Sequence, residues 1–263
     1  MTCGRNRRGS AAIALAGLVL MGAVRADDPA PKRYTCVRAE GPVRIDGKLD
    51  EDAWKRAAWT DWFMDIRGAQ GPEPRFHTRM KMLWDDDNFY VAAELEEPDV
   101  WATLTQHDSV IFRDNDFELF LNPTGDGLNY FEFEINALNT GWDLFLAKPY
   151  RKGGKADNSW EIPGLRTAVA IDGTLNDGHD QDRGWSVELA IPWSAFTERS
   201  GAGRPSPGTA WRMNFSRVEW QVRKSDGKYE KVPGLREDNW VWSPQGEVNM
   251  HIPERWGYVT FQR

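Results

Sequence analysis

A recurring alternation of apolar and polar residues is the feature of this chain that most restricts its fold. Phe117, Leu119 and Leu121 alternate with Asp116 and Glu118. A period of two places successive side chains on opposite faces of a β-strand, so this segment is expected to be a half-buried strand. Five further segments repeat the pattern: 76–82, 89–95, 131–135, 185–191 and 211–215. Many short strands with little helix predict an all-β fold, either a sandwich or a barrel.

One short helix is predicted near the N-terminus of this β-rich region, over Asp50–Ala58 (DEDAWKRAA). Asp50 is expected to cap it, acidic residues occupy its first turn, and Trp54 lies on an apolar side with Ala57 and Ala58. Further along, Pro192 and Trp193 are expected to end a strand and start a short turn of helix. No internal repeat or interdomain linker interrupts the pattern, so residues 41–263 are predicted to form one domain.

The N-terminal segment has the pattern of a secretory signal peptide. Residues 1–10 contain three arginines and no acid, residues 11–24 are an apolar run, and a cleavage site is expected after Ala26. A membrane span needs about 20 apolar residues, so the run is too short to be a stable anchor. The chain is therefore expected to be secreted or periplasmic, with no membrane span after cleavage. Residues 27–40 are then an extended lead-in.

Composition excludes several classes of partner and cofactor. With 33 Lys and Arg against 40 Asp and Glu, the net charge of -7 argues against a nucleic-acid partner. Removal of the signal peptide leaves Cys36 as the one cysteine, which excludes an internal disulfide and predicts a partly buried, unreactive thiol. The 14 tryptophans indicate either a thick aromatic core or flat surfaces that bind a ligand.

Four stretches of the chain, in this order and spacing, resemble the family 9 carbohydrate-binding module, part of a wider group that includes DOMON-type domains. The resemblance runs from about Gly41 to the C-terminus. It implies an antiparallel, jelly-roll-like β-sandwich that binds plant-polysaccharide fragments or chain ends, often beside glycoside hydrolases such as xylanases. The stretches are 45–54, 83–91, 114–121 and 184–193, followed by Asn214 and a closing Pro253-x-x-Trp256-Gly257. Most motif tryptophans fall on apolar faces and are expected in the core: Trp54, Trp84, Trp185 and Trp193.

The resemblance also implies where a sugar would be held, and this chain has different residues at those positions. Members of the family hold one sugar between two tryptophans, and the matching positions here are Phe112 and Met250. An arginine of those members corresponds to Glu134, whereas the acid at Glu118 is retained. Phe112 can still stack on a sugar, and Met250 offers an adaptable apolar surface.

Other residues in polar loops are candidates to complete a sugar site. A pyranose presents a flat C–H face to an aromatic ring and a rim of hydroxyls to polar side chains. The predicted aromatic platforms are Phe112, Trp142, Trp160 and Trp242. The predicted polar partners are Glu118, Glu134, Asn136, Asn249 and His251.

Two other functions and one cofactor remain open from the residues alone. Glu134, with Glu118 on an expected neighbouring strand, could form the carboxylate pair of a glycosyl hydrolase. The loop pair Met250 and His251, with Met80 or Met82, could ligate b-type haem, as some members of the wider sandwich group do. Calcium could bind in the acidic loops 85–87 or 172–182. The favoured interpretation is a non-catalytic sugar-binding protein that supports carbohydrate catabolism, working alone or with extracellular glycan-degrading proteins.

Overall fold

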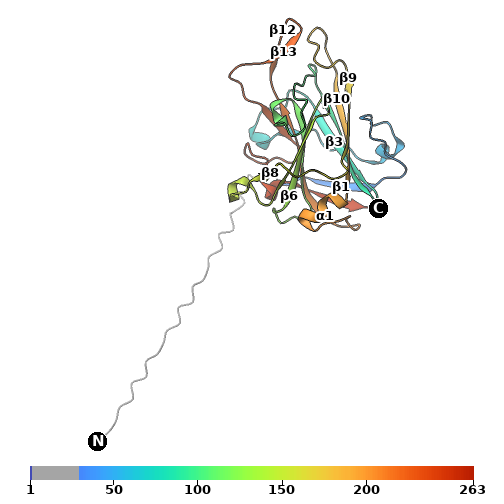
Figure 1. Cartoon of the computed structure of the whole chain (residues 1–263), viewed down its shortest axis with the longest axis vertical. Coiled ribbons are helices and arrows are strands. Elements are labelled where there is room, and N and C mark those ends of the chain that lie inside the picture. Colours follow the sequence, from blue (N-terminus) through green and yellow to red (C-terminus); the bar gives the residue numbers. More distant parts are fainter. Residues whose placement is uncertain (2–29) are drawn as a thin grey trace.

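The computed structural model describes Met1 and residues 30–263 (Figure 1). The predicted signal peptide and its cleavage site after Ala26 therefore lie outside the described residues, apart from Met1. The strands that shape the site are β3 (Thr78–Trp84), β4 (Asn88–Glu96), β5 (Asp116–Asn122), β6 (Tyr130–Asn136), β7 (Gly141–Leu146), β10 (Gly184–Pro192) and β11 (Ala210–Glu219). The other strands are β1 (Arg33–Arg38), β2 (Met64–Asp65), β8 (Ala156–Asp157), β9 (Arg166–Asp172), β12 (Val222–Ser225), β13 (Lys228–Lys231), β14 (Asp238–Val241) and β15 (Gly257–Gln262).

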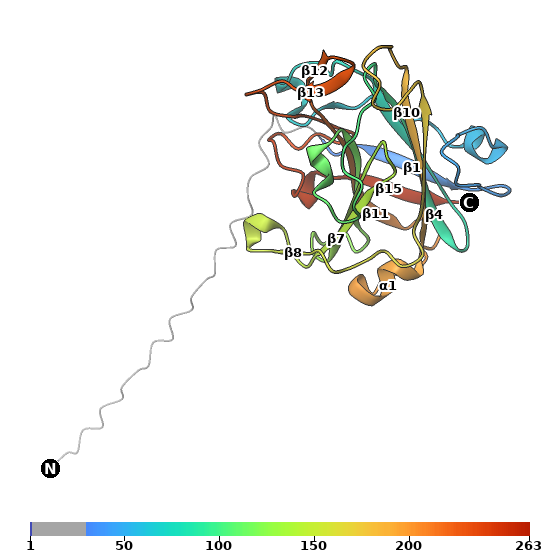
Figure 2. The same ribbon diagram turned by 45° about the horizontal axis from the view of Figure 1, so that its top comes forward.

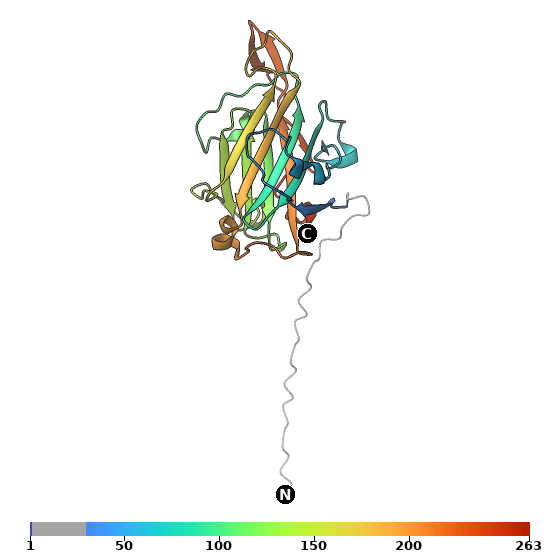
Figure 3. The ribbon, with the colours of Figure 1, turned by 90° about the vertical axis from the view of Figure 1, so that its right-hand side faces the viewer.

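The sheet curls over to form two packed layers. Within the described residues, 13 strands are hydrogen-bonded in the order β8-β7-β6-β5-β11-β15-β1-β3-β4-β10-β9, with β14 and β2 branching from β11. Figure 2 shows β7 and β11 in one layer and β4 and β10 in the other, and the long strands of the second layer lie side by side in Figure 3. The predicted β-sandwich is confirmed. Its pairs are antiparallel except that β1 runs parallel to both β15 and β3.

The hydrophobic core lies between the two layers and contains the apolar sides of the alternating segments. Phe117, Leu119 and Leu121 from β5 face Val91 and Leu189 of the other layer in one cluster, and all are at most 2% exposed. The motif tryptophans 54, 84, 185 and 193 are buried as predicted. Trp193 packs edge-on against Trp211 with ring centroids 5.5 Å apart. Much of the tryptophan content therefore fills the core.

The predicted helix over Asp50–Ala58 is wrong in type and length. Asp52–Arg56 forms one 3₁₀ turn, η1, and the residue before it is Glu51, whose side chain does not cap the turn. Five residues are too few for a stable α-helix, and burial of Trp54 holds this turn in place. The α-helix of the described residues is α1 (Ser194–Ser200), which starts after Trp193 as predicted. The remaining turns are η2 (Gly68–Gln70), η3 (Ile111–Arg113), η4 (Tyr150–Lys152) and η5 (Pro253–Arg255).

The segment predicted to be a lead-in contains a strand of the sheet. β1 lies between β15 and β3 and is hydrogen-bonded to both. Cys36, in the middle of this strand, has no exposed surface and no disulfide partner. Burial raises the pKa of its thiol well above the usual value, so the thiolate is disfavoured. Among the described residues, no helix is long and apolar enough to cross a membrane.

Candidate functional site

A row of carboxyl groups lies on the outer face of the layer that contains β5, β6 and β7. The alternation that turns Phe117 and Leu119 inward turns Glu118 outward, and Glu118 lies directly opposite Glu134 on β6. Glu134 in turn lies opposite Trp142 on β7. Loops cover this face, so Glu118 is 5% exposed, and Glu134 is 1% exposed. The carboxyls thus form the floor of a site instead of a solvated surface.

A groove of about 320 Å³ opens over this floor. On one side, Phe112 from η3 is 38% exposed, and its ring centroid lies 6.3 Å from that of Trp142 at an interplanar angle of 34°. The backbone N–H of Phe112 donates to Oε2 of Glu134 at 2.9 Å, which fixes the turn to the floor. On the other side, the loop before η5 contributes polar and apolar side chains. The groove brings together these predicted residues: Phe112, Glu118, Glu134, Trp142, Asn249, Met250 and His251.

Two predicted aromatic platforms are wrong. Trp160 is 6% exposed and packs on Phe131 with centroids 4.9 Å apart, and Trp242 is 3% exposed and packs on Phe215. Both rings belong to the hydrophobic core between the layers. Neither ring offers a face to a ligand.

The predicted polar partner Asn136 is also wrong. It is fully buried, and its side-chain amide donates to the Leu104 carbonyl and to Asp114. Its oxygen accepts the N–H groups of Leu138 and Thr140, which closes the turn between β6 and β7. Its hydrogen-bonding capacity is therefore used by the fold.

Several groove residues were not among the predicted site residues. Glu132 lies two positions before Glu134 and faces the same side, a relationship that the alternation shows. Tyr150, from η4, is 46% exposed at the rim. Its ring packs against His251 with centroids 4.5 Å apart, a contact that the sequence spacing does not indicate. The rest of the lining comes partly from strands, with Phe120, Leu144, Val218 and Asn239, and partly from loops, with Ile66, Glu237 and Val248.

Burial dominates the electrostatics of the floor. It raises the pKa of Glu118 to about 7, and it raises the pKa values of Glu132 and Glu134 well above the usual range, with the neighbouring Glu118 charge as the second cause. Among the described residues, no lysine or arginine forms an ion pair with these three acids. His251 does not compensate, because burial lowers its pKa to about 4. The floor therefore holds protons at neutral pH.

Protonated and ionised carboxyls together both donate and accept hydrogen bonds, which suits a ligand rich in hydroxyl groups. The hydroxyl of Ser216 already donates to Glu118, and one oxygen of Glu132 has no hydrogen-bond partner. Acid–base hydrolysis also uses a pair of carboxyls, one protonated and one ionised. Glu118 and Glu134 lie opposite each other and both have raised pKa values, so an assay of reducing sugar is needed to separate binding from hydrolysis.

The haem hypothesis loses its two strand methionines, Met80 and Met82, in the structure. Met80 and Met82 have no exposed surface and lie in the core between the layers, and neither lines the groove that contains His251. His251 lies with Nδ1 2.9 Å from the hydroxyl of Tyr130. The predicted pairing of His251 with a strand methionine is therefore wrong.

The acidic loops proposed for calcium use their oxygens within the fold. Asp85 accepts the N–H groups of Asp87 and Asn88 and the hydroxyl of Tyr90, while Asp86 pairs with arginines. In the second loop, Asp182 accepts two backbone N–H groups. These contacts explain the acids as turn formers.

An open groove with exposed aromatics on its rim and fixed polar groups on its floor, built on a β-sandwich, defines a small-ligand-binding module. The family described as "Carbohydrate family 9 binding domain-like" matches residues 45–263, and the chain belongs to this family. The match covers every strand of the sandwich except β1.

The curated relatives are much longer proteins, and the chain matches a small part of each. The chain is 24% identical over 164 residues to endo-1,4-beta-xylanase A of Thermoanaerobacterium saccharolyticum, covering 61% of this chain and 12% of the relative. It is 22% identical over 222 residues to the enzyme of the same name from Thermotoga neapolitana, covering 82% of this chain and 17% of the relative. The chain thus matches less than a fifth of the length of either xylanase.

Solved structures share the fold at low identity. A carbohydrate-binding module of family 9 from Caldicellulosiruptor kristjanssonii, in complex with cellotriose, superposes with a TM-score of 0.57 at 18% identity, covering 88% of this chain and 94% of that one. A putative carbohydrate-binding protein from Bacteroides uniformis gives a TM-score of 0.65 at 17% identity, covering 89% of this chain and all of the other. At such identities the likeness establishes the architecture of the sandwich.

Proposed function

We propose that this protein binds carbohydrate in the groove between Phe112 and His251 without cleaving it. The observation that carries the proposal is the exposed Phe112 ring beside Trp142, directly above the buried carboxyls of Glu118 and Glu134. An aromatic face accepts the C–H side of a pyranose, and the carboxyls meet its hydroxyls. Membership in the family 9 binding-domain group supports the same ligand class.

The ligand class that we propose is a fragment or chain end of a plant-type polysaccharide. A volume of about 320 Å³ lies near the lower limit for ligand pockets, which suits one end of a glycan better than a long mid-chain segment. The xylanase relatives and the cellotriose complex of a structural neighbour support β-linked glucans and xylans as first candidates.

We further propose that the protein is exported and acts outside the cytoplasm. The pattern of residues 1–26 supports a cleavable signal, and the relatives are polysaccharide-degrading enzymes. In that setting the module holds a glycan for partner enzymes of carbohydrate catabolism. Membership in the wider DOMON-type group is part of the same proposal and rests on the sequence motifs.

A titration of the purified protein with glucose, cellotriose and xylotriose tests the proposal. Trp142 lines the groove, so ligand binding is expected to change tryptophan fluorescence, and calorimetry on the same samples gives the stoichiometry. A panel of β-linked and α-linked glycans that leaves both signals unchanged would overturn it. Release of reducing sugar in these samples, lost in Glu118→Gln, would instead indicate hydrolysis.

A further inference from the structure

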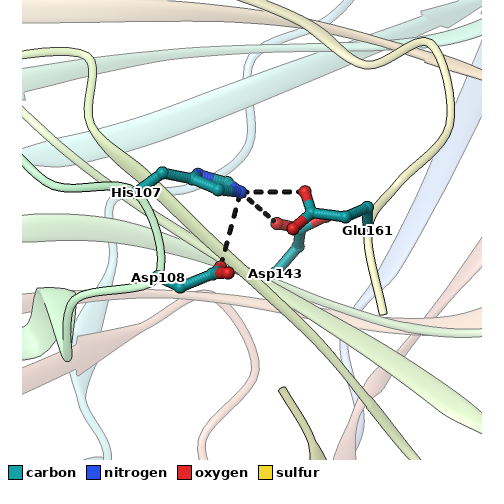
Figure 4. Close-up of side chains that lie close together, drawn as sticks. All are labelled: His107, Asp108, Asp143 and Glu161. Carbon is teal, nitrogen blue, oxygen red and sulfur yellow. Dashed lines mark hydrogen bonds and ion pairs between the residues drawn. The ribbon is translucent and has the colours of Figure 1, made fainter. Parts of the chain in front are cut away.

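A second cluster of polar side chains lies on the opposite side of β7 from the groove. Strand alternation turns Trp142 toward the groove and the next residue, Asp143, away from it. His107 and Asp108 reach Asp143 from the loop between β4 and β5, and Glu161 reaches it from the loop after β8 (Figure 4). Three segments distant in sequence therefore meet at one point.

The four side chains point their polar atoms at a common centre, as Figure 4 shows. Nε2 of His107 lies 2.9 Å from Oε2 of Glu161, 3.3 Å from Oδ1 of Asp143 and 3.4 Å from Oδ1 of Asp108. One candidate ligand atom from each residue lies within 4.8 Å of the others. In a tetrahedral zinc site with bonds of about 2.0–2.1 Å, neighbouring ligand atoms are roughly 3.3 Å apart. The observed contacts of Nε2 are close to that spacing.

Hydrogen bonds within the protein leave two carboxyl oxygens of this cluster without a partner. Asp143 is 2% exposed, and its Oδ2 accepts the N–H of Ile162, but its Oδ1 is buried and accepts no hydrogen bond. Oδ1 of Asp108 is also buried without a hydrogen-bond partner. A single ring N–H points at one acceptor, and Glu161 is the acceptor at hydrogen-bonding distance. The two unpartnered oxygens are the same atoms that face Nε2 of His107.

The cluster also contains more acidic groups than basic ones. Three carboxyls face one imidazole, and among residues 30–263 no lysine or arginine forms an ion pair with Asp108, Asp143 or Glu161. Burial raises the pKa of Asp143 to about 6 and also raises that of Asp108, and the neighbouring His107 charge only partly opposes these shifts. A buried charge is normally paired or bound to a metal ion.

We propose that His107, Asp108, Asp143 and Glu161 form a binding site for a divalent transition-metal ion, with zinc as the best fit. The imidazole nitrogen favours zinc over calcium or magnesium, which prefer oxygen ligands alone. Bound metal joins the loop that carries Phe112 to the strand that carries Trp142. The backbone N–H of Asp108 already donates to the Gly141 carbonyl at 3.1 Å, and the ion strengthens this attachment.

Metal titrations of the tag-free, chelator-treated chain test the site. Calorimetry is expected to detect one zinc ion per chain, and cobalt is expected to give the visible absorption of a tetrahedral N,O site. His107→Ala, a change of a largely exposed residue, is expected to weaken zinc binding at least tenfold and to remove the cobalt bands. His179→Ala, at another exposed histidine with an aspartate neighbour, is the matched control and is expected to change neither.

Asp143→Asn provides a second measurement, because it removes one ligand charge with almost no change in volume. It is expected to weaken zinc binding and to abolish the zinc-dependent rise in melting temperature. The proposal is overturned if the wild-type chain binds no zinc, or if His107→Ala and the wild type bind zinc equally. It is also overturned if calcium binds more tightly than zinc and independently of His107.

Discussion

Glu118 and Glu134 lie side by side on neighbouring antiparallel strands, with their side chains on the same face and almost no exposed surface. Like charges in directly opposed positions destabilise a sheet. The structure avoids the repulsion because burial favours the protonated carboxyls, so the pair can share protons. This relationship makes the floor of the groove sensitive to pH.

We predict that stability falls as the pH rises from 5 to 8. The pKa of Glu118 is about 7 in the folded protein, above the value of 4.5 that it has when exposed. The folded state therefore binds more protons between these values, and the free energy of unfolding decreases as the pH rises through them. Glu118→Gln cannot ionise. Relative to the wild type, this variant is expected to gain at least about 1.4 kcal/mol at pH 8, the equivalent of one pKa unit.

Chemical denaturation at pH 5 and at pH 8 measures this gain. The control is Glu198→Gln, because Glu198 is exposed on α1 and its replacement is expected to have the same effect at both pH values. A Glu118→Gln variant whose stability relative to wild type is the same at pH 5 and pH 8 would show that Glu118 is ionised throughout.

A second prediction concerns the rim of the groove. Phe112→Ala removes the exposed ring beside Trp142 and is expected to weaken binding of the best glycan about tenfold, which corresponds to about 1.4 kcal/mol. Calorimetry of the two proteins gives the difference. Trp62→Ala is the matched control, since Trp62 is 49% exposed but lines no part of this groove. Equal losses in both variants would place the sugar elsewhere.

The strands of the fold could be predicted because one period recurs with little interruption. Phe117 and Leu119 mark the inner face of β5 in the sequence as clearly as in the structure. The turn at Trp54 could not be assigned in the same way, because five residues carry too little local information to distinguish a 3₁₀ turn from an α-helix. Tertiary burial of the indole determines its shape.

The site was predictable only where it follows the strand pattern. Glu118 and Glu134 face outward by alternation, but the pattern predicts a solvated face, and their burial depends on loops that fold over it. For loop aromatics the sequence does not specify direction, so Trp160 was expected at the surface and lies in the core. The four metal-site residues share no motif, since they come from three separate segments.

A third prediction tests a buried ion pair network. Arg217 has no exposed surface, and its Nη2 lies 2.7 Å from Glu97 and 2.8 Å from Glu219, which are each 2% exposed. Arg217→Met leaves the buried Glu97 without a cation and Glu219 with only its longer pair to Arg75 at 3.7 Å, and it is expected to cost about 3–5 kcal/mol of unfolding free energy. The surface pair Arg223–Glu230 is the control, and Arg223→Met is expected to cost less than about 1 kcal/mol. Urea unfolding measures both, and similar losses would contradict the prediction.

The final prediction concerns Glu188, which joins two of the motif stretches, 45–54 and 184–193. Its carboxyl has no exposed surface and accepts three N–H groups: the indole of Trp54 at 2.7 Å and the backbone of Asp46 and Gly47 at 3.0 and 2.9 Å. Gly47 has a φ of +83°, and an added Cβ would lie 2.6 Å from the backbone of Ala170, so only glycine fits where the turn packs against β9.

Glu188→Ala leaves these donors unsatisfied, and each unmade bond costs about 1–3 kcal/mol. The expected loss is about 3–5 kcal/mol by urea unfolding, and Glu188→Gln, which keeps one acceptor oxygen, is expected to lose less. Glu94→Ala on the adjacent β4 is the control, because Glu94 forms only a part-exposed pair with Arg79 and is expected to cost less than about 1 kcal/mol. If Glu188→Ala costs no more than this control, water reaches the three donors, and packing of Trp54 alone holds the N-terminal turn against the sheet.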